Sequence, residues 1–179
     1  MKKYLSSLVL VIIAVLIAGC GSSRNSTLLQ IENFSLLYRG SVELEQQILN
    51  PADQQWIIAI FQENRTNEFW DSLIAVESYN QWKGVNVFSQ ESITTLEERG
   101  LTIENLKTER FLLSCSKELK SSVVYSYFIS SGFSLEIPQL YMTQLFIENG
   151  NNIVVFSHST TSSEEQQQML KSFTAIYCS

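Results

Sequence analysis

One residue, His158, bears most directly on catalysis, because it is the only histidine among the 179 residues of this sequence. A hydrolase that uses serine, histidine and a carboxylate would need it as the general base. The two aspartates, Asp53 and Asp71, lie in no recognisable motif, and no Gly-x-Ser-x-Gly sequence marks a nucleophilic serine. We therefore interpret His158 as a surface or hydrogen-bonded structural residue, and we predict no catalytic residues.

The other groups that commonly bind metals or cofactors form no recognisable site. Three glutamate pairs are close in sequence: Glu43 with Glu45, Glu97 with Glu98, and Glu164 with Glu165. None has the spacing of an EF-hand, and the seven glycines form no phosphate-binding loop. Cys115 and Cys178, with one histidine, lack the spacing of a zinc site. We predict neither a metal nor a cofactor.

The N-terminus has the three parts of an export signal. Lys2 and Lys3 precede an unbroken apolar run over residues 8–18, which is too short for a membrane span of about 20 residues. The run leads into Ile17-Ala18-Gly19-Cys20, which resembles the lipobox of bacterial lipoproteins. This resemblance implies that the Cys20 thiol is diacylated and that the chain is cut before it. The alternative is an ordinary secretory signal near an unrelated cysteine.

These features divide the chain into a signal peptide (1–19), a lipidated cysteine with a flexible tether (20–29) and one folded domain (30–179). Residues 21–27 are small and polar, as in a flexible linker, although an irregular first strand is the alternative. Two or more acyl chains bind a membrane firmly, because each buried CH₂ contributes about 0.8 kcal/mol. We therefore expect a cell-envelope protein anchored by lipid, with its domain outside the cytoplasm.

The charge of the chain argues against nucleic-acid binding. There are 12 Lys and Arg against 18 Asp and Glu, a net charge of −6. Loss of Lys2 and Lys3 with the signal reduces the 12 basic residues to ten and makes the net charge −8. An acidic domain with scattered bases lacks the clustered positive face that neutralises phosphates. The sequence therefore predicts no nucleic-acid partner, and attachment to the membrane through lipid alone.

The three cysteines fit an exported protein. If Cys20 carries lipid, Cys115 and Cys178 remain as a pair. A disulfide persists in the oxidising compartments that exported proteins reach. We predict that these two residues form a disulfide, with two separate buried thiols as the alternative.

Apolar patterns predict an α+β domain with a largely antiparallel sheet. Strands are expected over residues 31–38, 56–61, 69–79, 109–116, 122–130, 138–148 and 152–158, whereas residues 42–49 are ambiguous between strand and helix. The sequence from Glu148 to Asn152 contains an Asn-Gly step and predicts a hairpin turn. Residues 174–178 are expected to close the chain in an extended conformation.

Two helices are expected to pack on this sheet. Helical spacing predicts a long central helix over residues 89–107, with Ser89 as its N-cap, Glu91 in its first turn, and apolar positions Ile93, Leu96, Ile103 and Leu106. Gly100 lies inside that pattern, and a break there is the alternative. Ser162 and Glu165 have the spacing of a capping box and open a C-terminal helix.

This order of elements resembles the PsbP-like α/β/α sandwich. The resemblance rests on a strand pair, a helix ending at Ile103-Glu-Asn-Leu-Lys107, a meander through residues 141–146 and 154–157, and a final helix over residues 165–173. It implies a fold found in accessory subunits of membrane complexes, small-protein binders and bacterial lipoproteins. It implies no shared active site, since a fold alone does not fix function.

The tryptophans are the remaining candidates for binding. Trp82 is expected in a loop before the long helix and Trp70 near a turn, where exposed aromatic side chains serve as binding anchors. Trp56 is expected in the core. We infer a non-enzymatic envelope protein that binds a protein partner or assists a membrane complex. The alternative is a small-ligand carrier or an unrecognised hydrolase, which a concave pocket holding His158 with a serine and a carboxylate would favour.

Overall fold

The computed structural model describes residues 26–31, 33–39, 43–48, 55–63, 72–80, 83–115, 118–131 and 139–178. Only the backbone is described for Arg39 and for residues 43–48 and 55–63. The elements in chain order are β1 (Ser26–Ile31), β2 (Phe34–Arg39), β3 (Glu43–Ile48), β4 (Gln55–Glu63), β5 (Ser72–Asn80), α1 (Val85–Glu98), β6 (Thr102–Ser114), β7 (Leu119–Ser131), β8 (Leu140–Asn149), β9 (Asn152–Thr160), α2 (Ser163–Thr174) and β10 (Tyr177–Cys178).

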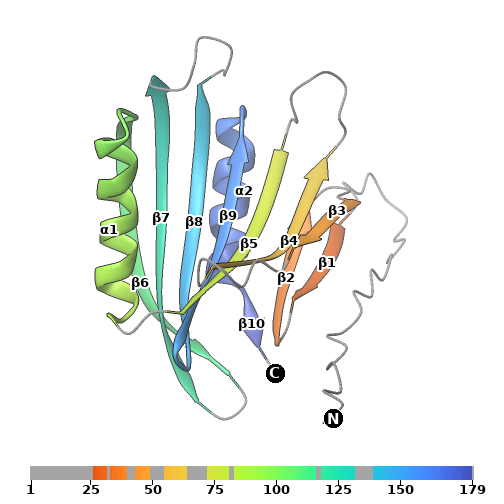
Figure 1. Ribbon diagram of the computed structural model, residues 1–179. Coiled ribbons are helices and arrows are strands. Elements are labelled where there is room, and N and C mark those ends of the chain that lie inside the picture. Colours follow the sequence, from red (N-terminus) through yellow and green to blue (C-terminus); the bar gives the residue numbers. More distant parts are fainter. Residues whose placement is uncertain are drawn as a thin grey trace, which may run out of the picture.

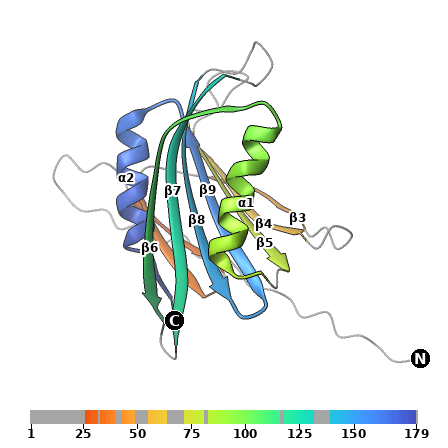
Figure 2. The ribbon, with the colours of Figure 1, turned by 90° about the vertical axis from the view of Figure 1, so that its left-hand side faces the viewer.

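A seven-stranded antiparallel sheet forms the centre of the domain, in the order β3-β4-β5-β9-β8-β7-β6. A second antiparallel sheet has the order β1-β2-β10. Figures 1 and 2 show the large sheet between the two helices, with α1 on one face and α2 on the other. The small sheet packs on the same face as α2. The predicted α+β class with a largely antiparallel sheet is confirmed.

Each face of the large sheet has its own hydrophobic core, because successive side chains of a strand point to opposite faces. In β9, Val154 and Phe156 pack with α2 and the small sheet, whereas Ile153 and Val155 pack with α1. Most of the central strands β7, β8 and β9 is therefore apolar on both faces, as expected for a sheet that is covered on both sides.

The predicted long central helix is wrong. Helix α1 begins at Val85 and ends at Glu98, and residues 102–114 form strand β6, which pairs with β7. The chain turns at Gly100, whose φ of +85° lies in the left-handed region that favours glycine. The segment 103–107, on which part of the family resemblance rested, is therefore strand and not helix. Ile103 and Leu106 fit the helical spacing by coincidence. The alternative, a break at Gly100, is correct.

The predicted start of this helix is also wrong. Ser89 is buried inside α1, where its hydroxyl donates to the backbone carbonyl of Asn86 at 3.1 Å. Gly84 is the N-cap and makes no side-chain capping bond, and the first turn contains no acidic residue. The helix begins four residues early because Val85 is an apolar residue with a place in the core, where it is 1% exposed.

The N-terminal strands differ from the prediction as well. The single strand expected over residues 31–38 is two strands, β1 and β2, which pair with Ile31 opposite Phe34. Strand β1 begins at Ser26, so residues 26–29 of the predicted tether belong to the fold, and Leu29 is 2% exposed. The predicted signal peptide, Cys20 and the rest of the tether, to residue 25, lie outside the described residues.

Three predictions for the C-terminal half are confirmed, whereas the extended segment expected over residues 174–178 is shorter, because Thr174 ends α2 and only Tyr177–Cys178 form strand β10. Cys115 and Cys178 form a disulfide with their Cα atoms 4.9 Å apart, and it joins the end of β6 to β10. The Ser162 side chain accepts a hydrogen bond from the Glu165 backbone N–H, which makes it the N-cap of α2. Strands β8 and β9 form the expected hairpin, with Gly150 at φ +63° in its turn.

Candidate functional site

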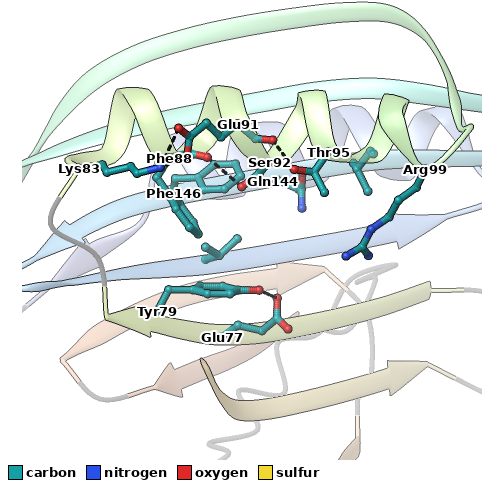
Figure 3. Close-up of a pocket in the computed structure, with 12 residues that line it drawn as sticks. Glu77, Tyr79, Lys83, Phe88, Glu91, Ser92, Thr95, Arg99, Gln144 and Phe146 are labelled. Atoms are coloured by element: carbon teal, nitrogen blue, oxygen red, sulfur yellow. Dashed lines mark hydrogen bonds and ion pairs between the residues drawn. The ribbon is translucent and has the colours of Figure 1, made fainter. Parts of the chain in front are cut away.

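A cleft of about 540 Å³ lies between α1 and the large sheet (Figure 3). We call it the α1 cleft. Its lining comes from β5, from α1 and the residues that flank it, and from β8 and β9: Glu77, Tyr79, Lys83, Phe88, Glu91, Ser92, Thr95, Leu96, Arg99, Gln144, Phe146 and Val155.

The periodicities of helix and strand explain why these residues meet. Phe88, Ser92 and Leu96 recur at four-residue spacing and therefore form one stripe along α1. Opposite them, each strand contributes alternate residues of its α1 face, such as Glu77 and Tyr79 of β5. The cleft is thus the space between a helical stripe and one face of a sheet.

Aromatic side chains make one end of this cleft apolar. The Phe88 ring lies 5.0 Å from the Tyr79 ring and 6.2 Å from the Phe146 ring, measured between ring centroids. Phe146 and Val155 are almost fully buried in the core beneath α1, so they are held rigidly. The exposed apolar surface at this end of the cleft is therefore that of the half-buried Tyr79 and Phe88 rings, which rest on this fixed core.

A hydrogen-bonded ladder fixes the polar part of the floor. Gln144 accepts a hydrogen bond from the Tyr127 hydroxyl at 2.7 Å and donates to the Ser157 hydroxyl at 3.0 Å. Burial raises the pKa of Tyr127, so its hydroxyl keeps the proton that it donates. The Gln144 carboxamide is thereby held across β7, β8 and β9 in one orientation.

The charged groups of the cleft differ in whether they have a hydrogen-bond or ion-pair partner. Lys83, just before α1, is paired with Glu91 at 2.9 Å. The Tyr79 hydroxyl donates to Glu77 at 3.0 Å, and burial, followed by the nearby charge of Glu77, raises the pKa of Tyr79. Arg99 lies at the other end of α1 from Lys83, and its side chain reaches from the helix toward the sheet (Figure 3). Among the described residues, no hydrogen-bond or ion-pair partner of the Arg99 guanidinium is found.

His158 lies on the other face of the sheet, in the core beneath α2. Its Nε2 is 2.8 Å from the Ser72 hydroxyl oxygen, which also accepts a hydrogen bond from the Tyr38 hydroxyl. His158 and Ser72 are each 1% exposed, and desolvation by burial lowers the pKa of His158 to about 4. His158 is therefore a neutral core residue at pH 7, as the hydrogen-bonded structural interpretation expected.

The surroundings of His158 hold a serine and a carboxylate but almost no space. Its Nδ1 atom is buried and has no hydrogen-bond partner among the described residues, and it lies next to a cavity of about 10 Å³ that Glu165 also lines. A cavity of this size holds about one water molecule. The Glu165 carboxylate instead accepts a hydrogen bond from the Thr160 hydroxyl at 2.6 Å. At 1% exposure each, neither Ser72 nor His158 presents a surface to a substrate in this structure.

The structure brings together only one set of the predicted site residues, the disulfide pair Cys115 and Cys178. Cys20, Trp70 and Trp82 lie outside the described residues, and the side chain of Trp56 is not described. Within the part of the chain that is described, no three His, Cys, Asp or Glu side chains form a group that could hold a metal ion. None of the helices in this part is long and apolar enough to span a membrane.

The residues of the α1 cleft were not predicted as a site from the sequence. The available signal was polar residues inside otherwise apolar strands: Glu77 in β5 and Gln144 in β8. A polar residue in such a position faces either solvent or a shared polar site, and the sequence does not show which strands are neighbours. Arg99 could not be recognised as a cleft residue, because the predicted helix over residues 89–107 places it in the middle of a helix and not at its end.

Comparison with solved structures places the domain among PsbP-like folds. The solution structure of cyanobacterial PsbP (CyanoP) from Synechocystis sp. PCC 6803 matches with a TM-score of 0.56 and 10% sequence identity, over 91% of this chain and 99% of that one. A protein of unknown function from Pseudomonas aeruginosa matches with a TM-score of 0.47 and 13% identity, over 76% of this chain and 93% of that one. No protein-family model matches the chain, and no curated protein sequence matches it significantly.

The first match shows the fold: an α+β domain with mostly antiparallel strands and two helices, similar to PsbP. The second is too distant to support an argument. At 10% identity the likeness carries no information about partners or ligands.

Proposed function

We propose that this protein is a non-enzymatic, lipid-anchored binding protein of the cell envelope, and that the α1 cleft is its binding site. The observation that carries the proposal is the cleft itself, with its rigid aromatic end, its fixed carboxamide and its charged residues. Binding sites for small molecules are typically concave spaces of about 300–1,000 Å³ with an apolar lining and a few placed polar groups. A cleft of about 540 Å³ falls within that range of volume, and its lining combines an apolar end with polar and charged groups.

The location of the serine and histidine supports binding over hydrolysis. Ser72 and His158 are buried beneath α2, on the opposite face of the sheet from the cleft. A hydrolase needs its nucleophile within reach of a bound substrate. The large cavity and the candidate catalytic pair therefore do not belong to one site.

The N-terminal sequence and the disulfide support the location. The lipobox-like sequence ending at Cys20 predicts a lipid anchor, and the Cys115–Cys178 disulfide suits an oxidising compartment. A lipid anchor restricts the domain to the membrane surface, where a weak binding site meets membrane-bound partners at high effective concentration.

We predict that Cys20→Ser abolishes lipidation and leaves the signal uncut at that site, because the thiol is the acceptor of the acyl chains. Incorporation of labelled palmitate, measured in wild type and variant, tests this prediction. Wild-type protein should carry label and the variant should carry none. Equal labelling of the two proteins would show that Cys20 is not the lipidated residue.

The binding protein could carry a small ligand or assist a protein complex, and the volume of the cleft favours the small-ligand carrier. Native mass spectrometry of the protein extracted from its own membrane separates the two. A carrier should appear partly as a complex heavier by the mass of a small organic molecule, and an accessory protein as a complex with another polypeptide. Ser92→Trp should remove either complex by filling the cleft, whereas Gln167→Trp, on an exposed position of α2, should retain it.

The binding proposal would be overturned if Ser92→Trp retained the complex while far-ultraviolet circular dichroism showed the fold to be intact. A complex lost equally in both variants would also contradict the assignment to the cleft.

A further inference from the structure

We infer that the ligand of the α1 cleft presents a carboxylate to Arg99 and an apolar group to the aromatic end of the cleft. This inference rests on the proposed function, since it names the chemistry of the ligand at the same site. Of the two cations that line the cleft, Lys83 is paired with Glu91, whereas Arg99 has no partner among the described residues.

The Arg99 guanidinium is the donor that the described residues leave available. The other cation of the cleft, the Lys83 ammonium, is bonded to both carboxylate oxygens of Glu91 at 2.9 Å. An arginine offers five N–H donors in a planar fork that matches a carboxylate with two parallel hydrogen bonds. Its side chain reaches from the C-terminal end of α1 toward the sheet (Figure 3).

The charge of the cleft favours a monoanion over a phosphate. The Lys83–Glu91 pair is neutral, and Arg99 is the cation that remains among the described residues lining the cleft. A bound carboxylate would bring a single negative charge to this guanidinium. A phosphate dianion would bring two, with Arg99 as the one cation of the described lining to compensate them.

The aromatic end of the cleft indicates the apolar group of the ligand. The rings of Tyr79, Phe88 and Phe146 are close to one another, and rigid aromatic surfaces of this kind bind apolar groups. Leu96 and Val155 also contribute apolar groups to the lining. The shared chemistry is therefore an acid group joined to an apolar body, as in an arylalkanoic acid or the C-terminal residue of a peptide that ends in phenylalanine.

Four probes test this inference in the folded protein from residue 20 onward with Cys20→Ser, observed by amide chemical shifts. They are 3-phenylpropionate and acetyl-Gly-Phe, each with its neutral carboxamide twin. Both acids should shift the amides of Ser92, Thr95 and Leu96. Each acid should bind at least ten times more tightly than its amide. The acid that binds more tightly indicates whether the natural ligand is a small molecule or a chain terminus.

The variant Arg99→Gln should remove the preference for acid over amide. Lys171→Gln, which removes a cation from α2 on the opposite face of the sheet, is the matched control and should preserve the preference. A preference that persists in Arg99→Gln would overturn the role of Arg99.

Failure of this inference is distinguishable from failure of the proposed function. If acids and amides bind the cleft equally, the carboxylate assignment is wrong and the binding site stands. If no probe shifts the cleft residues, the carboxylate assignment is also wrong. The complex observed by mass spectrometry with wild type and Ser92→Trp then decides the binding proposal independently.

Discussion

Replacing both Cys115 and Cys178 with alanine should lower the free energy of unfolding by about 4 kcal/mol. The disulfide closes a loop between residues 63 positions apart. Cross-linking a loop of this length lowers the entropy of the unfolded chain and so raises its free energy by about 4 kcal/mol. The disulfide also holds β10, a two-residue strand at the end of the chain, next to β6. Short terminal segments fray unless they are tied to the rest of the fold.

Urea denaturation with and without reductant measures this effect. Wild-type protein should unfold at a lower urea concentration when the disulfide is reduced, whereas the double variant should be insensitive to reductant. Because the variant also removes buried sulfur atoms, reduction of the unaltered chain serves as its control. An unchanged midpoint for fully reduced wild-type protein would contradict the predicted contribution.

Lowering the pH from 7 to 5 should destabilise the protein through His158 by about 2 kcal/mol. In the folded protein, burial lowers the pKa of His158 to about 4 from its ordinary value of 6.5. Below pH 6.5, His158 therefore binds a proton in the unfolded chain but stays neutral in the folded chain until the pH approaches 4. The free energy of unfolding consequently falls as the pH falls. The contribution is complete above pH 6.5, and the total loss reaches about 3 kcal/mol as the pH approaches 4.

The groups that face His158 determine whether this loss occurs. Ser72 and Tyr38 are neutral hydroxyls, and neither compensates a charged imidazole. Glu165 lines the small cavity beside His158, but Thr160 donates to its carboxylate. Should the Glu165 carboxylate turn toward His158 instead, it would favour the protonated ring and reduce the loss.

Two measurements test the prediction for His158. His158→Gln, which keeps a group able to bond Ser72, should be less dependent on pH between 7 and 5 than wild type. If that variant does not fold, the imidazole signals of wild-type protein, followed by nuclear magnetic resonance, report the pKa directly. A ring pKa at or above 6.5 would contradict the buried, uncompensated environment that we describe.

The features that sequence predicted correctly are those determined by neighbouring residues. Ser162 and Glu165 make a cap within one helical turn, and the Asn-Gly step between β8 and β9 requires only a local turn. The disulfide is a long-range feature, and it was nevertheless predictable because Cys115 and Cys178 were the only partners left once Cys20 was assigned to lipid.

The features that sequence did not predict depend on pairing between distant segments. Ile103 and Leu106 fit a helix as well as a strand, and only the ladder with β7 decides between the two. The α1 cleft needs β5, β8 and β9 to be neighbours, but β5 precedes β9 by more than 70 residues in sequence. Without the strand order, the sequence does not show that Glu77, Gln144 and Arg99 line the same cleft.

The most direct test of the α1 cleft is a photo-cross-linking amino acid placed in it, in the lipidated protein in intact envelopes. Thr95 is suitable because it lines the cleft and is exposed, and Gln167, exposed on α2, provides the matched control on the opposite face. We predict a specific adduct from position 95 that is absent from position 167 and that Ser92→Trp eliminates. Adducts of equal yield from both positions, or an adduct from position 95 that survives Ser92→Trp, would contradict the assignment of the cleft as the binding site.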